Sequence, residues 1–170
     1  NQLYNGSYST TSIKVSNSTL ELKRAELNIK LNADNGSSIQ MEDTVIERWG
    51  SNILTIKDSS VTSINTVLKG GSAEQDYPAV FLSRSTAKLQ NTEVIQPLYR
   101  AAVCLTNSAS LESIGASLTS IRAISSRVCI EQTVIRESLM LESNSFCRVR
   151  DFVDIIGENE EKIDIYCGAS

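Results

Sequence analysis

The sequence predicts an all-β chain that folds as a parallel β-solenoid of about five to seven coils. A short strand-like pattern recurs along the chain, and Ser, Thr, Val, Ile and Leu are abundant while aromatic residues make up only 5% of the 170 residues. Helical stripes with a 3.6-residue period are missing over most of the chain. Short strands separated by hydroxyl-bearing turns explain this composition better than long helices do.

The repeated pattern is apolar–x–apolar–x–polar–hydroxyl. Its first copy runs from Ile13 to Ser18, and later copies begin at Leu54, Val80, Val103 and Val128. These later copies follow one another at nearly equal intervals, within the range of about 20–50 residues that marks repeat architectures. Further copies begin at Ile39 and Ala87. A short strand repeated at this interval leaves room for two more short strands with their turns, which is the length of one solenoid coil.

Because side chains alternate along a strand, the first and third pattern positions are expected to face the interior. The predicted inner columns are Leu54, Val80, Val103, Val128 and Ile56, Leu82, Leu105, Ile130. The predicted hydroxyl column, at the turns, is Ser59, Ser85, Ser108, Thr133.

The second pattern position is expected to face outward, and it carries Lys14, Thr55, Phe81, Cys104 and Cys129. The last three do not suit solvent. We therefore expect this stretch to be covered by a neighbouring chain, by the loop around residues 70–77 or by cross-linking, unless the sheet is buried on both sides there.

The remaining segments fit around this repeat. Residues 18–32 allow a helix in their first half, whereas the alternation in their second half favours a strand. Gly70 to Asp76 is expected to be a loop that Pro78 ends. The whole chain, 1–170, is interpreted as a single solenoid domain.

The ends of the chain are less regular. The repeat is clearest over residues 13–149, and residues 150–170 are expected to form a C-terminal cap. Because the chain begins with Asn1 rather than Met, we expect a mature product or a piece of a longer protein.

The repeat resembles that of the right-handed parallel β-helix superfamily, the pectin-lyase-like proteins, over roughly residues 13 to 149. The resemblance lies in the style of the repeat and not in a catalytic motif. Two other folds remain open. Residues 110–121 also suit a leucine-rich or receptor-L-type repeat, and short strands alone are compatible with a β-sandwich.

The chemistry open to the chain is limited because it contains no His. This excludes the usual Ser–His and Cys–His nucleophilic systems, and the absence of Gly-rich phosphate loops and of CxxC motifs argues against nucleotide and zinc cofactors. No cofactor is therefore expected. Glycoside hydrolysis by paired carboxylates remains, and the resemblance implies a second chemistry, an eliminative lyase with acidic calcium ligands.

The carboxylates considered for such chemistry are Glu42, Asp43, Asp58, Glu93, Glu112, Glu131 and Glu137. We interpret them as outward residues that keep a solenoid soluble. The stacked turn residues Asp58, Arg84, Asn107 and Gln132 differ in charge and do not converge on one metal. Trp49 is interpreted as a partly covered corner residue. We therefore assign no catalytic, cofactor-binding or metal-binding residue.

The four cysteines are candidates for disulfides. Cys104 and Cys129 hold the same pattern position in consecutive copies, which predicts Cα atoms about 4.7–4.9 Å apart, within disulfide range. Cys147 and Cys167 are a second candidate pair. Four reduced cysteines remain the alternative.

Asn5, Asn17 and Asn35 are formal N-glycosylation sequons. They give weak support to an extracellular location.

The net charge of −4, with scattered basic residues, argues against nucleic-acid binding, and no apolar run is long enough to insert in a membrane. We expect a non-catalytic structural, adhesive or spike module at a cell or virion surface or outside the cell. Its expected partners are a glycan, another surface protein or a second copy of the chain. The alternatives are a polysaccharide-degrading lyase or glycoside hydrolase, or a fragment of one as in phage tailspikes, and an intracellular scaffold.

Overall fold

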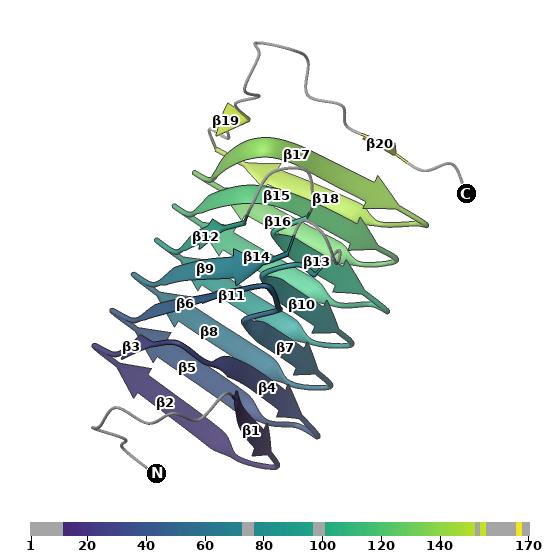
Figure 1. Cartoon of the computed structure of the whole chain (residues 1–170). Coiled ribbons are helices and arrows are strands. Elements are labelled where there is room, and N and C mark those ends of the chain that lie inside the picture. Colours follow the sequence, from purple (N-terminus) through teal and green to yellow (C-terminus); the bar gives the residue numbers. More distant parts are fainter. Residues whose placement is uncertain (1–11, 73–76, 97–100, 152–153, 156–165, 168–170) are drawn as a thin grey trace.

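The computed structural model describes residues 12–72, 77–96, 101–151, 154–155 and 166–167. These residues are all-β, without a helix, and their parallel strands stack into a β-solenoid of about six turns (Figure 1). The predicted fold class and number of coils are confirmed.

Two sheets make up the solenoid, with seven strands in sheet B and thirteen in sheet A. Sheet B contains β2 (Thr19–Lys23), β5 (Ser38–Glu42), β8 (Ser60–Ile64), β11 (Thr86–Gln90), β14 (Ser110–Ile114), β16 (Arg127–Glu131) and β18 (Phe146–Arg150). In sheet A, one half contains β3 (Glu26–Leu27), β6 (Val45–Trp49), β9 (Val67–Gly71) and β12 (Glu93–Ile95). The other half contains β1 (Ser12–Ser16), β4 (Lys30–Asp34), β7 (Leu54–Lys57), β10 (Val80–Ser83) and β13 (Val103–Thr106). The halves are joined by β15 (Ser117–Ile124) and β17 (Val134–Glu142), and β17 also pairs with β19 (Asp154–Ile155) and β20 (Tyr166–Cys167).

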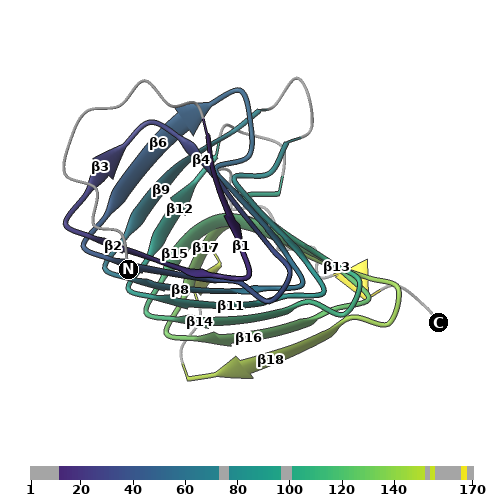
Figure 2. The ribbon, with the colours of Figure 1, turned by 90° about the horizontal axis from the view of Figure 1, so that it is seen from below.

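Each coil follows a three-sided path, seen along the stack in Figure 2. The chain passes from sheet B to the first half of sheet A, then to its second half, and returns to sheet B. Apolar side chains point inward from all three sides, and they form one continuous core that extends from Val15 to Leu141. Stacking of successive coils is what buries each inner side chain, as in other solenoids.

Coil length varies more than the sequence pattern indicates. Leu54 is in register with Val80 of the next coil, whereas Val103 is in register with Ile121, after a distinctly shorter stretch of chain. The longer coils carry extra residues between the two halves of sheet A, and β15 instead runs through both halves with a register shift between Leu118 and Ser120.

This shortening corrects the predicted inner columns. Leu54, Val80 and Val103 do share one column, and so do Ile56, Leu82 and Leu105, but Ile121 and Ala123 continue these columns. The predicted members Val128 and Ile130 lie in sheet B instead, beside Leu111 and Ser113. The pattern also matches at Val128 because β16, the strand that follows β15, has the same apolar alternation. β16 nevertheless belongs to sheet B and not to sheet A.

Two corners, rather than one, hold the hydroxyl groups. Ser59 and Ser85 lie at the corner that enters sheet B, where Ser85 Oγ donates to Ile56 O at 3.0 Å and accepts from Ser59 N at 3.2 Å. Thr133 lies at the corner that leaves sheet B and donates to Ser113 O at 3.2 Å. The register places Ala109, not Ser108, in the Ser85 row.

Two segment predictions need correction, and a third lies mostly outside the described residues. The first half of residues 18–32 contains strand β2, not a helix. Gly70 and Gly71 belong to strand β9 rather than to a loop. Residues 73–76 and most of the predicted cap, 150–170, lie outside the described residues, so the cap stays a prediction.

Candidate functional site

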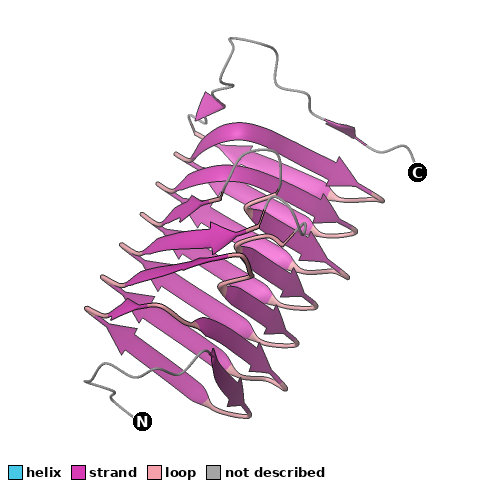
Figure 3. Ribbon diagram, in the orientation of Figure 1, coloured by secondary structure: helices cyan, strands magenta, loops and turns pink. Residues whose placement is uncertain are grey.

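The outer face of sheet B is the most regular surface of the described chain. Where the structure describes them, both of its borders are short turns, whereas the longer coils have their extra residues between the two halves of sheet A (Figure 3). Inner positions are filled by residues such as Ile39 and Leu111, which are fully buried. Because side chains alternate, every second residue of each strand projects outward and stacks in register with the coils on either side.

Three rows of side chains run along this face, parallel to the solenoid axis. The first row is Thr19, Ser38, Ser60, Thr86, Ser110, Arg127 and Phe146. The second is Glu21, Gln40, Thr62, Lys88, Glu112, Cys129 and Arg148. The third is Lys23, Glu42, Ile64, Gln90, Ile114, Glu131 and Arg150.

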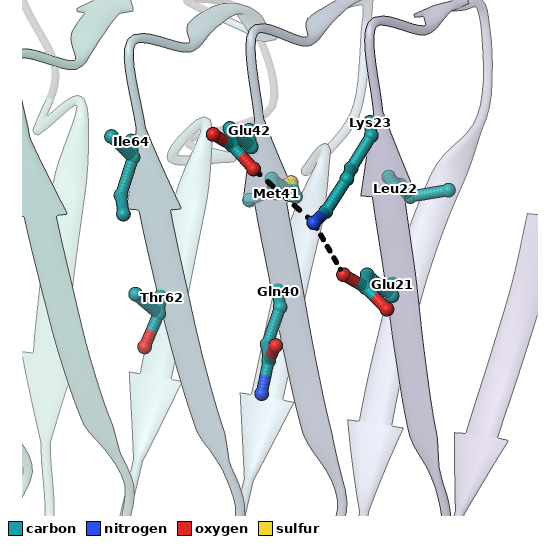
Figure 4. A pocket seen from close by; sticks show the side chains of 8 residues that line it. All are labelled: Glu21, Leu22, Lys23, Gln40, Met41, Glu42, Thr62 and Ile64. Atoms are coloured by element: carbon teal, nitrogen blue, oxygen red, sulfur yellow. Dashed lines mark ion pairs between the residues drawn. The ribbon is translucent and has the colours of Figure 1, made fainter. Parts of the chain in front are cut away.

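A shallow depression of about 280 Å³ lies at the N-terminal end of this face (Figure 4). Lys23 projects over it, with Nζ 2.9 Å from Glu21 Oε1 and 3.4 Å from Glu42 Oε2. The hydrogen bond and charge of Glu21, and then those of Glu42, raise the pKa of Lys23 above its usual value. Thr62 and Ile64 complete the side toward the next coil.

The middle of the face combines polar and apolar groups. Lys88 Nζ lies 3.3 Å from Glu112 Oε2 across neighbouring coils. Ile64 and Ile114 are half-buried although they point outward, with Gln90 in register between them. Amide, hydroxyl, ion-paired and apolar groups therefore lie side by side on one surface.

The seven candidate carboxylates do not gather at one place. Glu42, Glu112 and Glu131 lie on the outer face of sheet B, and Glu42 and Glu112 there form ion pairs with lysines. Asp43 lies in a turn and accepts a hydrogen bond from Asn65 Nδ2 at 3.2 Å. Glu93 and Glu137 belong to sheet A. Within the residues described, no group of three or more His, Cys, Asp or Glu side chains could hold a metal ion.

Asp58 pairs with Arg84 of the next coil. Arg84 Nε and Nη2 donate to Asp58 Oδ1 and Oδ2 at 2.6 and 2.7 Å. The hydrogen bonds from Arg84 lower the pKa of Asp58 below its usual value, so this carboxylate is ionised and is not suited to donate a proton. Asn107 follows in the same corner, but Gln132 lies at the other corner, which corrects the predicted row of four turn residues.

The predicted neighbourhood of Cys104 and Cys129 is wrong. Cys104 lies in sheet A in register with Phe81 and Arg122, whereas Cys129 lies in sheet B in register with Glu112 and Arg148. The two cysteines occupy different sides of the coil, so the argument for a disulfide between them fails.

The strand register does not decide whether the second candidate pair, Cys147 and Cys167, forms a disulfide. Cys147 is in register with Val128 in sheet B, and the backbone of Cys167 lies beside Leu141 in sheet A. A bridge between Cys147 and Cys167 stays a prediction. Phe81 is half-buried between Thr55 and Cys104 in the outward row of sheet A, and its proposed contact with a second copy also stays a prediction.

Two of the three sequons lie at exposed turns. Asn17 and Asn35 are exposed and adopt positive φ angles of 49° and 55°. The hydroxyl of Ser37, in the second of these sequons, already donates to Asp34 O at 2.6 Å. Asn5 lies outside the described residues.

Trp49 ends strand β6 with 48% of its surface exposed, and its Nε1 donates to Glu47 Oε1 at 3.1 Å. It therefore lies on the side of the coil formed by the first half of sheet A, away from the outer face of sheet B.

The sequence contained a signal for the sheet B face. The secondary pattern copies that begin at Ile39 and Ala87 correspond to strands β5 and β11 of sheet B. Aligned with each other, these copies form a second series whose outward residues, such as Gln40 and Lys88, define this face.

The fold and the face together define a parallel β-solenoid with one regular side, on which polar and apolar side chains stack in rows. No protein-family model matches the chain, and neither the curated proteins nor the solved structures contain a significant match. None of the described residues forms a helix that could cross a membrane.

Proposed function

We propose that this protein is a non-catalytic module of an extracellular, cell or virion surface that binds an extended glycan on the outer face of sheet B. The observation that supports this most is the face itself, on which hydroxyl, amide and charged groups repeat coil after coil between two borders of short turns. A polymer of repeating sugars presents repeating hydroxyl groups, which such rows can meet with hydrogen bonds.

The arrangement of acidic groups supports binding rather than catalysis. A glycosidase needs one carboxyl group that stays protonated near a second carboxylate. Glu42 and Glu112 instead pair with lysines, and Arg84 lowers the pKa of Asp58.

The half-buried isoleucines support the same proposal. Ile64 and Ile114 offer apolar contact for the faces of sugar rings, with the Gln90 amide between them. Sugar recognition commonly combines apolar contact with a few well-placed polar groups.

Binding to neutral and charged polysaccharides, measured by affinity electrophoresis and then by titration calorimetry on the full chain, tests the proposal. We expect the paired change Gln40→Ala and Gln90→Ala to weaken binding at least tenfold. The matched control, Asn32→Ala with Thr55→Ala, removes outward polar groups from sheet A and is expected to change the affinity less than about twofold. Equal losses in both variants, or no binding to any glycan, would contradict the proposal.

The same samples address the alternative of an enzyme. Formation of new reducing ends or of unsaturated sugar products during incubation would show a polysaccharide-degrading activity and overturn the non-catalytic part of the proposal.

A further inference from the structure

An arginine cluster lies at the C-terminal end of the sheet B face. It consists of Arg127 on β16 and Arg148 and Arg150 on β18, all three exposed. Val128 and Ile130 of β16 are buried, and β18 is in register with β16, so the alternating positions Arg127, Arg148 and Arg150 belong to the outer face.

These arginines differ from most other cations of the described chain in lacking a partner. Neighbouring coils elsewhere neutralise each other, as in the pairs Lys14–Asp34, Lys69–Glu47, Arg84–Asp58, Lys88–Glu112 and Arg122–Glu142. For the three guanidinium groups of the cluster, the described part of the structure contains no ion pair and no hydrogen bond.

The acidic groups near the cluster do not cancel it. Glu131 is in register with Arg150 but forms no ion pair with it within the described residues. Glu112, one strand further along, is held by Lys88, and Asp151 lies at the turn that follows β18. Among the residues that the structure describes, the three positive charges therefore face at most two nearby carboxylates that are not already paired.

The spacing within the cluster suits an anion with several oxygens. Neighbouring strands lie about 4.8 Å apart and alternate residues of one strand about 6.6 Å apart. Arg148 therefore starts roughly 7 Å from Arg150 and roughly 8 Å from Arg127, whereas Arg127 and Arg150 start about 14 Å apart on either side of it. A single guanidinium fork can satisfy both oxygens of a carboxylate. Two forks, that of Arg148 with that of either Arg150 or Arg127, can share an ester group with three terminal oxygens.

An aromatic ring adjoins the cluster. Phe146 is 60% exposed and in register with Arg127 on the neighbouring strand. An exposed aromatic ring can pack against the apolar face of a sugar, which places an attached anionic group near the arginines.

We propose that the arginine cluster, with Phe146, binds sulfate ester groups of a glycan. This proposal rests on the proposed glycan-binding function and names the chemical class of the ligand. A nucleic acid fits less well, because the chain carries a net charge of −4 and three arginines do not make the long basic track that a phosphate backbone requires.

The test compares dextran sulfate with unmodified dextran, carboxymethyl dextran and a single-stranded oligonucleotide, titrated against the full chain at low and physiological salt. We expect dextran sulfate to bind most tightly, with an affinity that falls as salt rises. The paired change Arg148→Gln and Arg150→Gln should weaken this binding at least tenfold, while Arg148→Lys with Arg150→Lys should retain part of it because charge remains without the fork.

Arg24→Gln is the matched control, since Arg24 is also an exposed arginine but lies at the other end of the solenoid. Its dextran sulfate affinity should stay within about twofold, and circular dichroism should show that all variants remain folded, as exposed substitutions usually do. Unchanged dextran sulfate binding in the double Gln variant, or equal or tighter binding of carboxymethyl dextran or the oligonucleotide, would overturn the proposal.

The two proposals can fail separately. If the Gln40→Ala and Gln90→Ala protein loses dextran sulfate binding while the arginine variants keep it, the glycan-binding face is supported. The arginine cluster is then not part of the binding site, and the sulfate proposal is overturned. Binding of the oligonucleotide alone would contradict both.

Discussion

Replacing Leu105 with alanine is expected to lower the free energy of unfolding by about 2–5 kcal/mol. Leu105 is fully buried and stacks between Leu82 of the preceding coil and Ala123 of the following coil. The smaller side chain loses apolar burial and leaves a cavity that a closely stacked coil cannot easily fill. Urea denaturation followed by circular dichroism measures the loss.

Thr106→Ala is the control for this prediction. The sequence pattern predicts an almost neutral change at Thr106, but its Oγ1 donates to Leu82 O at 3.3 Å. We therefore expect a cost of about 0.5–1.5 kcal/mol, which is typical of a lost hydrogen bond. Equal costs at Leu105 and Thr106 would contradict the inward assignment of Leu105.

Replacing Gly71 with alanine is expected to cost about 2–4 kcal/mol, from backbone strain and overpacking together. Gly71 has a φ of +92°, and an added Cβ would lie 2.7 Å from Tyr77 O and 2.8 Å from Gln96 Cδ. Gln96 is held in place because its Nε2 donates to Tyr77 O and its Oε1 accepts from Ala79 N.

Gly36→Ala separates the cost of backbone strain from the cost of overpacking. Gly36 has a similar φ of +75°, but nothing lies within 4 Å of an added Cβ. Only the left-handed backbone is penalised there, by roughly 1–2 kcal/mol. Thermal and urea unfolding of both variants should therefore show a larger loss for Gly71→Ala, and a loss no larger than that of Gly36→Ala would contradict the close packing around Gly71.

Much of the architecture could be predicted from local alternation. The pattern from Leu54 through Leu105 identified inner residues correctly, because each strand must direct alternate side chains into a core that exists only between stacked coils. The strand at Ile39 was also found, as a secondary copy of the pattern.

The errors arose where coil length changes. The sequence pattern does not show that β15 takes the place of two strands. The coil that begins at Val103 is therefore shorter, with Ile121 as the residue in register with Val103. Val128 consequently lies in sheet B rather than in sheet A. Every misassigned feature near Val128, including the neighbourhood of Cys104 and Cys129, follows from this one change of period. The outer face of sheet B and its arginine cluster escaped prediction because they depend on which strands stack, not on the pattern within a strand.

The stacking of β13 on β15 is therefore the central structural claim, and cross-linking tests it most directly. In an Arg122→Cys variant, the introduced thiol should be in register with Cys104, at a Cα distance of about 4.8 Å that a disulfide or a short bis-thiosulfonate cross-linker can bridge. Peptide mapping of the oxidised protein without reduction should show residue 122 linked to Cys104. A link between Cys104 and Cys129, with residue 122 left unlinked, would contradict this stacking.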